Sequence, residues 1–384
     1  MKTLGELCNI VSGGTPLRSK TEFWDGGTIP WIKISNIKEK YVSEADEFIT
    51  EEGLLGSSAK MLNKGTVLYT IFATLGEVGI LKINACTNQA IAGLTIKDPT
   101  KLSTDYLYYY LKSKKSYVNS IGRGVAQNNI NMTLLKKFVI PLPNLLKQNE
   151  IVGVLDNVSN IIDIHQKELK YLDELVKARF VEMFGNPISN PLSWEKRTLK
   201  EVCVKVNDGT HSSPESYESG QYKYITAKNI KISGFDFSNI TYVSEEIHRP
   251  IYNRCNPEIG DVLYIKDGAT TGIAMVNTLE EEFTLLSSVA LLKQNRSIMN
   301  GYFLTALLNN EDMYKDIRNY MGGAAITRLT IAKLNSINVI LPPIELQNNF
   351  ADFVKQVDKS MEIIQKKIDT YQELFDKLMQ EYFG

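Results

Sequence analysis

The most constraining feature of this sequence is an internal repeat that spans almost its whole length. From Leu4 the chain reads LGELCNIVSGGTP, and from Leu199 it reads LKEVCVKVNDGTH. In the last third of each copy the offset is constant at 199 positions, so that Gln148 falls on Gln347. A repeat of this length predicts two copies of one fold, and any structure proposed for the chain has to accommodate both.

Each copy closes with a long segment in which heptad core residues alternate at spacings of four and three, a pattern typical of paired helices. The core positions of the first segment are Ile151, Leu155, Val158, Ile162, His165, Leu169, Leu172, Val176, Arg179 and Met183. Those of the second are Phe350, Val354, Val357, Met361, Ile364, Ile368, Tyr371, Phe375, Leu378 and Tyr382. Neither segment contains proline, so we expect helices of roughly 36 residues, about 54 Å long.

Two helices that end equivalent modules and meet across a perpendicular pseudo-twofold axis run antiparallel, and this arrangement would hold the two modules at opposite ends of a rod. We therefore divide the chain into globular half one (1–146), helical segment one (147–185), globular half two (186–345) and helical segment two (346–384). Within the halves, β-rich runs alternate with helical stretches. The runs are 28–34, 65–72, 222–227 and 260–266, and the helical stretches are 104–121 and 301–318. The sequence predicts an α/β fold: two globular domains joined by two long antiparallel coiled-coil helices.

Composition excludes several classes of protein. The chain is 43% apolar and 23% charged, as expected for a globular protein with a folded core. Its four cysteines are widely spaced and form no CxxC pair, so neither a disulfide framework nor a zinc cluster is indicated. No stretch of 18 apolar residues and no signal-peptide pattern is present. We expect a cytoplasmic protein with no membrane span.

The sequence offers no catalytic constellation. It has no GxxxxGK[ST] phosphate loop, no [DNS]PP[YFW] run of the kind that amino-methyltransferases use, and no GxGxxG between a strand and a helix. The histidines His165, His211 and His248 are too few and too scattered for a metal site. We expect no catalytic residue and no metal ligand in this chain.

Two polar residues interrupt the apolar heptad positions. His165 and Arg179 stand where the second copy has Ile364 and Leu378. A polar residue in an apolar seam commonly fixes register or partner choice, which is the interpretation we favour. A pH-dependent role for His165 is the alternative. Cys8 and Cys203, which recur at matched positions, are expected to be small core residues.

Polar, glycine-containing loops occupy corresponding positions in both halves. In half one they are 13–19, 33–36, 72–79 and 122–129, and in half two they are 208–214, 226–229, 266–272 and 322–328. Their Arg, Lys, Asn, Gln, Ser and Thr residues are the types that donate to phosphates and read base edges. Taken alone, the loops are explained more simply as solvated turns.

The charge of each segment helps to decide between DNA-binding loops and solvated turns. Half one has 17 basic and 12 acidic residues, whereas half two has 16 and 18. Half one could therefore hold a phosphate backbone unaided, and half two could do so only through a local patch such as Lys228, Lys266 and Arg328. Because counterion release drives DNA binding, we expect weak binding by this chain alone and partners that contribute cations.

These features together resemble the DNA-specificity subunit of a Type I restriction-modification system. GGTPLRS…EFW…GGTIPWIKISNI (13–37) and DGTHSSP…YKYITAKNI (208–230) are similar to two different types of target-recognition domain in that family. IPLP and LPP segments followed by a Gln-Asn pair introduce the two long helices, as in the family. The usual Glu-Gln is replaced by Lys147-Gln148 and by Leu346-Gln347.

The resemblance implies that each half reads one half of a bipartite, asymmetric DNA target, while the helices set the length of the unread spacer. It implies as partners double-stranded DNA, two adenine methyltransferase subunits that bring S-adenosylmethionine and base flipping, and restriction subunits that use ATP and Mg²⁺. This chain would carry no cofactor and supply only the recognition of the target sequence.

Loop position and residue type select the candidate base contacts. They are Arg18, Lys33, Ser35, Asn36, Arg123, Gln127, Asn128, Thr210, His211, Thr226, Lys228, Asn229, Lys266 and Arg328. The candidate coiled-coil interface comprises Leu155, Ile162, Leu169, Val176, Val354, Met361, Ile368 and Phe375. Two alternatives remain open: a non-catalytic coiled-coil scaffold that holds two ligand-binding domains apart, and a self-sufficient nuclease or methyltransferase.

Overall fold

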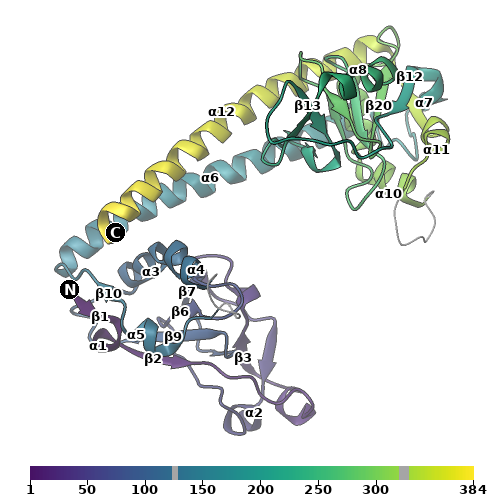
Figure 1. Cartoon of the computed structure of the whole chain (residues 1–384). Helices are drawn as coiled ribbons and strands as arrows, with labels where there is room; N and C mark the ends of the chain where they lie inside the picture. The colour runs from purple at the N-terminus through teal and green to yellow at the C-terminus, as the bar shows by residue number, and fades with distance from the viewer. Residues whose placement is uncertain (123–128, 320–327) are drawn as a thin grey trace. The chain divides into compact units, whose positions relative to one another are not determined.

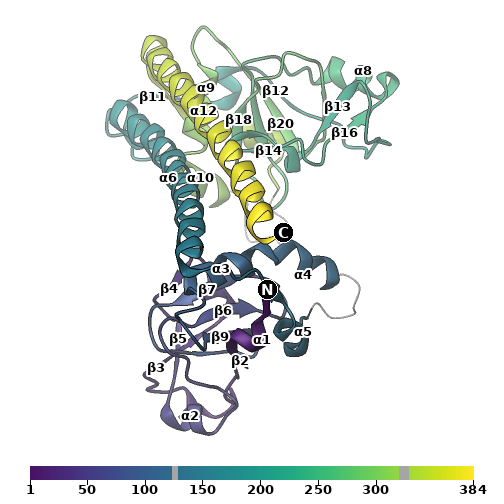
Figure 2. The same cartoon turned by 90° about the vertical axis from the view of Figure 1, so that its left-hand side faces the viewer.

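The computed structural model describes residues 1–122, 129–319 and 328–384 (Figures 1 and 2). The chain forms two compact units, Met1–Gln166 with Lys366–Gly384 and Lys167–Gln365, which we call unit 1 and unit 2. Each unit therefore contains one globular half together with part of both long helices. The four segments of the sequence divide the chain differently, because the helices are shared between the units.

Unit 1 is built around a five-stranded sheet of order β2-β9-β6-β7-β4 and a three-stranded sheet of order β5-β3-β8. The first sheet comprises β2 (Cys8–Ser12), β4 (Tyr41–Val42), β6 (Val67–Thr70), β7 (Val78–Leu81) and β9 (Ile91–Ile96). The second comprises β3 (Ile29–Ile32), β5 (Glu47–Ile49) and β8 (Cys86–Thr87), and a two-stranded ladder joins β1 (Lys2–Thr3) to β10 (Val139–Ile140). The helices are α1 (Leu4–Leu7), α2 (Glu51–Leu55), α3 (Thr104–Ser113), α4 (Lys115–Gly122) and α5 (Met132–Lys136), with 3-10 turns η1 (Thr21–Phe23) and η2 (Ile34–Asn36).

Unit 2 repeats this plan. Its four-stranded sheet, β12-β20-β17-β18, and its three-stranded sheet, β16-β13-β19, correspond to the two sheets of unit 1. These strands are β12 (Cys203–Asp208), β13 (Tyr222–Ile225), β16 (Thr241–Val243), β17 (Val262–Ile265), β18 (Ala274–Val276), β19 (Thr284–Leu285) and β20 (Val289–Gln294). Two further ladders join β11 (Glu195–Thr198) to β21 (Asn338–Leu341) and β14 (Ile230–Lys231) to β15 (Gly234–Phe235). The helices are α7 (Leu199–Val202), α8 (Glu245–Arg254), α9 (Gly301–Leu308), α10 (Glu311–Asn319) and α11 (Ile331–Asn335), with the 3-10 turn η3 (Ala227–Asn229).

The pairing of the strands confirms the repeat. β3 runs antiparallel to β5 and parallel to β8, and β13 runs antiparallel to β16 and parallel to β19. In both units, a short helix after the first strand begins with the same cap, because the backbone N–H of Thr3 or Thr198 donates to Glu6 or Glu201 at 2.7 Å. The predicted α/β fold and its repetition are therefore present in the structure.

Each predicted helical stretch within the halves is broken in two. The stretch 104–121 forms α3 and α4, which are separated at Lys114, and 301–318 forms α9 and α10. In unit 2 the break is stabilised by Asn310, whose side-chain oxygen accepts from the backbone N–H of Asp312 and Met313. Asn309 is the C-cap of α9, and Asn310 caps the start of α10, at a point that apolar periodicity does not reveal. Figure 2 shows α3, which packs against β6 and β7.

The two long helices are α6 (Leu145–Phe184) and α12 (Ile344–Phe383), each of 40 residues. In unit 1 the ring of His165 on α6 stacks on Tyr371 of α12, and in unit 2 Phe180 of α6 contacts Phe350 of α12. Residue numbers therefore rise along one helix as they fall along the other, which is the antiparallel arrangement that we predicted.

Burial of the helices follows the predicted seam in part. Leu155, Ile162, Val354, Ile368 and Phe375 are buried, whereas Leu169, Val176 and Met361 are half-buried. Towards the ends, the buried positions move by one residue to Phe180 and Phe184 and to Met379 and Phe383. There the helices pack on a globular half: the ring of Phe184 lies 4.7 Å from that of Phe303 on α9, and the ring of Phe383 lies 5.1 Å from that of Tyr106 on α3.

A buried glutamine joins the first turn of each long helix to its own globular half. The side-chain oxygen of Gln148 accepts from the backbone N–H of Ser103 at 2.9 Å, and its nitrogen donates to the carbonyls of Lys101 and Pro143, both at 2.8 Å. Gln347 repeats this pattern, accepting from the N–H of Asn300 at 2.9 Å and donating to two carbonyls. Both side chains are fully buried, which explains why glutamine recurs at this position of the repeat.

Candidate nucleic-acid interface

In half one, the candidate loop residue Arg18 belongs to a cluster that also contains Lys33, Glu47 and two tryptophans. The guanidinium of Arg18 lies 3.7 Å from the ring centroid of Trp24 and 5.0 Å from that of Trp31. One carboxylate oxygen of Glu47 lies 2.5 Å from Nη2 of Arg18, and the other accepts from Nζ of Lys33 at 2.5 Å. The side chain of Arg18 is 53% exposed. The structure therefore brings together two of the predicted residues, and it adds an acidic residue that sequence analysis did not select.

The hydrogen bond from Lys33, together with the charge of Arg18, lowers the pKa of Glu47 below its ordinary value of 4.5, although partial burial acts in the opposite direction. The carboxylate is therefore ionised at neutral pH and neutralises part of the positive charge of the cluster. One carboxylate against two cations leaves a net positive charge at a solvent-facing position.

The other predicted residues of half one have different environments. Ser35 is exposed on η2, whereas the side-chain oxygen of Asn36 accepts from the backbone N–H of Lys33 at 2.8 Å. Asn36 therefore stabilises the 3-10 turn that follows β3. The remaining predictions for this half, Arg123, Gln127 and Asn128, lie outside the described residues.

In half two, η3 has the same construction as η2. The side-chain oxygen of Asn229 accepts from the backbone N–H of Thr226 at 3.0 Å and from its hydroxyl at 2.9 Å. Its amide nitrogen donates to the carbonyl of Asp236 at 3.0 Å, and the side chain is only 3% exposed. Asn229 and Thr226 thus shape the turn, and Lys228 between them is the exposed side chain that the turn presents.

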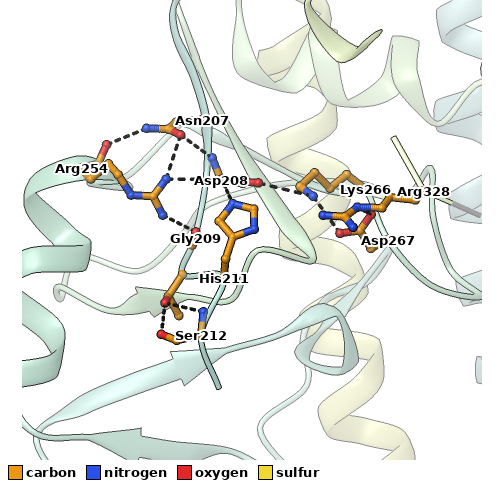
Figure 3. A network of polar contacts seen from close by, with 10 residues as sticks. Asn207, Asp208, Gly209, His211, Ser212, Arg254, Lys266, Asp267 and Arg328 are labelled. Atoms are coloured by element: carbon orange, nitrogen blue, oxygen red, sulfur yellow. Dashed lines mark hydrogen bonds and ion pairs between the residues drawn. The ribbon is translucent and has the colours of Figure 1, made fainter. Parts of the chain in front are cut away.

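A network of charged residues lies where two strands of half two end, as Figure 3 shows. Asp208 is the last residue of β12, and Lys266 and Asp267 directly follow β17. Both strands run antiparallel to β20, which lies between them, so their carboxyl ends meet at one edge of the sheet. Nζ of Lys266 lies 3.4 Å from Oδ2 of Asp208 and 2.7 Å from Oδ2 of Asp267.

Lys266 is only 1% exposed, and this burial changes our interpretation of it. A lysine ammonium without a partner would be costly in this environment, and two carboxylates offset that cost. The ammonium of Lys266 is buried and binds two carboxylates. We therefore infer that Lys266 positions the loop after β17 and does not contact a base. The basic patch available in half two is correspondingly smaller than the sequence suggested.

Two arginines lie at the exposed side of this network. Nε of Arg328, whose side chain is 58% exposed, lies 3.4 Å from Oδ1 of Asp267. Arg254 on α8 lies 3.5 Å from Oδ1 of Asp208 and donates to the carbonyl of Gly209. Arg254 holds the start of the 208–214 loop, a role that sequence analysis missed.

The loop that begins at Gly209 also contains the predicted residues Thr210 and His211. Thr210 is 6% exposed, and its hydroxyl shares a hydrogen bond of 2.7 Å with that of Ser212. The His211 side chain is 58% exposed, and its Nε2 lies 3.2 Å from Oδ1 of Asp208. His211 is thus the solvent-facing candidate of this pair, and Thr210 is part of the loop's internal structure.

The site residues predicted from the sequence are hydrogen-bond donors, and the acidic residues that position them were not among them. Glu47, Asp208 and Asp267 each bind at least one predicted basic residue. For Asp267 a signal existed, because it directly follows Lys266 in the sequence. Asp208 and Lys266 are far apart in the chain, and only the order of the strands brings them together.

Comparison with known proteins identifies the family. The chain matches the Type I restriction modification DNA specificity domain twice, over residues 1–174 and 191–371. The chain belongs to this family. The two matched regions correspond to the two copies of the repeat.

Relatives agree with this assignment, and a solved structure shares the fold. The MjaIX specificity subunit of a Type I restriction enzyme from Methanocaldococcus jannaschii is 24% identical over 99% of this chain and 91% of its own length. The EcoR124I/EcoR124II specificity subunit from Escherichia coli is 28% identical over 46% of this chain and 47% of its own. The fold is similar to that of the S subunit of a Type I restriction-modification system from Mycoplasma genitalium, with a TM-score of 0.60, 19% identity and coverage of 100% and 95% of the two chains.

Two further observations concern what the described residues lack. Among them we find no group of three or more His, Cys, Asp or Glu side chains that could hold a metal ion. Within the same ranges, no helix is both long enough and apolar enough to cross a membrane.

Proposed function

We propose that this chain reads a bipartite, asymmetric target in double-stranded DNA, with one half-site recognised by each globular half. The observation that carries the proposal is that four strands of the larger sheet and all three strands of the smaller sheet have the same order in both halves, while the exposed loops differ. Arg18 and Ser35 are exposed on half one, whereas Lys228, His211 and Arg328 are exposed on half two. Because different side chains select different bases, two unlike loop sets favour two unlike half-sites.

The charge distribution supports an unequal contribution of the two halves to affinity. Half one carries five more basic than acidic residues, whereas half two carries two fewer, and its Lys266 is enclosed by two carboxylates. Contacts to phosphates supply most of the salt-dependent affinity for DNA. We therefore expect half one to contribute more of this affinity, and half two to depend on cations from partner subunits.

We further propose that the chain is not itself an enzyme, and that it acts in the cytoplasm. Two methyltransferase subunits would supply S-adenosylmethionine chemistry, and restriction subunits would supply the reactions that need ATP and Mg²⁺. Exposed apolar side chains on the long helices support docking of protein partners there. They include Ile164, Tyr171 and Leu175 of α6 and Ile363 and Leu374 of α12, which are 41–64% exposed.

The decisive experiment is co-expression with the adenine methyltransferase subunit, followed by mapping of methyladenine across the host genome by single-molecule sequencing. We expect one motif with two unlike specific parts and a fixed gap between them. Methylation without a gapped motif, or no complex between the chains, would favour the coiled-coil scaffold.

A matched pair of variants then tests half two. Lys228→Ala removes the exposed cation of η3, whereas Lys200→Ala removes an exposed cation of α7 that lies outside the candidate loops. Lys228→Ala is expected to weaken binding or relax the motif in one half-site only, and Lys200→Ala is expected to leave both half-sites intact. Equal behaviour of the two variants would refute the assignment of η3 to DNA contact.

A further inference from the structure

The cluster around Arg18 has a geometry that suits one base more than any other DNA group. We propose that Arg18 reads a guanine in the half-site of half one, and that Glu47 is a positioning residue that presents the arginine for this contact. This inference rests on the proposed function, to which it adds the identity of a base and of the residues that select it.

Arg18 is held in place by two tryptophan rings. Its guanidinium stacks at 3.7 Å from the ring centroid of Trp24, whose indole N–H donates to the carbonyl of Leu17 at 3.3 Å. Trp31, 2% exposed, meets Trp24 edge-on at 5.1 Å and donates to the carbonyl of Gly14 at 2.9 Å. Stacking of this kind fixes the plane of a guanidinium and lowers the entropy lost when it binds a ligand.

The loop that carries Arg18 is itself fixed at its base. The backbone N–H groups of Gly13 and Gly14 donate to the carbonyls of Ile91 and Thr87 at 3.0 and 2.9 Å. A Cβ atom at Gly14 would lie 2.4 Å from the backbone nitrogen of Ala59, so glycine is required for this close approach. The loop therefore presents Arg18 from a rigid support.

Arg18 keeps hydrogen-bond donors that Glu47 does not occupy. Glu47 contacts it at Nη2, and Arg18 makes no other hydrogen bond or ion pair to the residues that the structure describes. A planar guanidinium with one edge held by a carboxylate keeps donors that form a fork on another edge. With its side chain 53% exposed, Arg18 can direct that fork outward.

The charge of Glu47 favours a base over a phosphate as the partner of Arg18. Glu47 neutralises part of the positive charge of the cluster, so a phosphate anion is attracted less strongly here than at an arginine without a carboxylate partner. The contact with an uncharged acceptor pair depends less on net charge, because it rests on the direction of the donors. Guanine presents two adjacent acceptors, O6 and N7, in the major groove, whereas adenine and cytosine present an amino donor there, and thymine offers a single acceptor.

Half two contains a comparable arrangement, which supports this interpretation of the cluster. Oδ2 of Asp267 binds Lys266, and Oδ1 of Asp267 lies 3.4 Å from Nε of the exposed Arg328. An acidic residue thus lies between a lysine and an exposed arginine in each half, although the residues involved occupy different positions of the repeat.

The test uses the assembled complex of this chain with its methyltransferase subunits and DNA of the mapped target. Each guanine of half-site one is replaced in turn by 7-deazaguanine, which lacks the N7 acceptor. We expect the wild-type complex to lose affinity about 10- to 100-fold at one of these positions. Arg18→Ala should bind the unmodified target more weakly and show no further loss with 7-deazaguanine at that position.

Two conservative variants separate recognition from a merely structural role. Arg18→Lys keeps the charge but not the fork, so it should retain methylation while accepting adenine as well as guanine at that position. Glu47→Gln should relax the same position and no other. Arg197→Ala, which removes an exposed arginine that is bound to Glu195 on β11, serves as the control and should leave the motif unchanged.

The outcomes distinguish this inference from the proposed function. If the wild-type complex binds a gapped target but is indifferent to 7-deazaguanine throughout half-site one, or if that half-site contains no guanine, the role of Arg18 is refuted and the proposed function stands. The same holds if Arg18→Ala keeps the full sensitivity to 7-deazaguanine. If no gapped target exists, both fail together.

Discussion

Replacing Gln148 by methionine tests how the globular half is attached to its long helix. Methionine has a similar length and helix propensity, so the variant removes polar contacts with little change in volume. Three hydrogen bonds are lost, from the N–H of Ser103 and to the carbonyls of Lys101 and Pro143. At about 0.5 to 1.5 kcal/mol for each bond, the local free energy of opening should fall by roughly 1.5 to 4.5 kcal/mol.

Hydrogen exchange read by mass spectrometry measures this loss at a defined amide. The side chain of Gln148 accepts from the N–H of Ser103, so that amide should exchange roughly 10- to 2,000-fold faster in the variant. Gln347→Met should have the same effect on the amide of Asn300, which donates to Gln347. Gln166→Met, at an exposed position of α6, is the matched control. An amide of Ser103 that keeps its protection in Gln148→Met would refute the argument.

Three more predictions follow from burial and charge. Phe184→Ala removes a fully buried ring that contacts three other phenylalanine rings, so it should lower the free energy of unfolding by about 3 to 5 kcal/mol. Val181→Ala, at a half-exposed position of the same helix, should change it by less than about 1 kcal/mol. Urea titrations of the two variants would measure the difference. Burial raises the pKa of Cys8 to about 12, so this thiol should not react with a thiol-specific reagent at pH 8 until the protein is unfolded, and labelling of the native protein would contradict this. Folding lowers the pKa of Glu47, so the stability that its carboxylate contributes is present above its ordinary pKa of 4.5 and is lost as the pH falls through the lower folded value. The melting temperatures of the wild type and Glu47→Gln should therefore converge on acidification. A constant difference between pH 7 and pH 3 would contradict the direction of the pKa shift.

Much of the fold was predictable because its signals are periodic or repeated. The heptad pattern predicted both long helices, which the structure extends slightly to 40 residues each. The repeat predicted two equivalent α/β modules without reference to the positions of individual strands. The ends of the helices were less predictable, since the buried positions there, such as Phe184, are chosen by the globular half that the helix meets and not by the partner helix.

The candidate site was predictable at the level of loops but not of individual side chains. Arg18, Lys228 and Arg328 face solvent as expected, and whether they contact DNA stays a prediction. Asn229 and Lys266 have the residue types of base contacts, yet they are buried with internal partners. Residue type alone does not reveal this difference, because the same donor serves a turn, an ion pair or a base.

The sequence by itself determined the repeat, the two long helices, the α/β character of the halves and the resemblance to the specificity family, because these depend on spacing along the chain. Only the tertiary structure decided which charged residues meet. Asp208 and Lys266 are far apart in the sequence and come together because β12 and β17 both pair with β20. Glu47 reaches Lys33 and Arg18 for a similar reason, since β5 pairs with β3. Strand pairing is a long-range property, and so are the charge networks that depend on it.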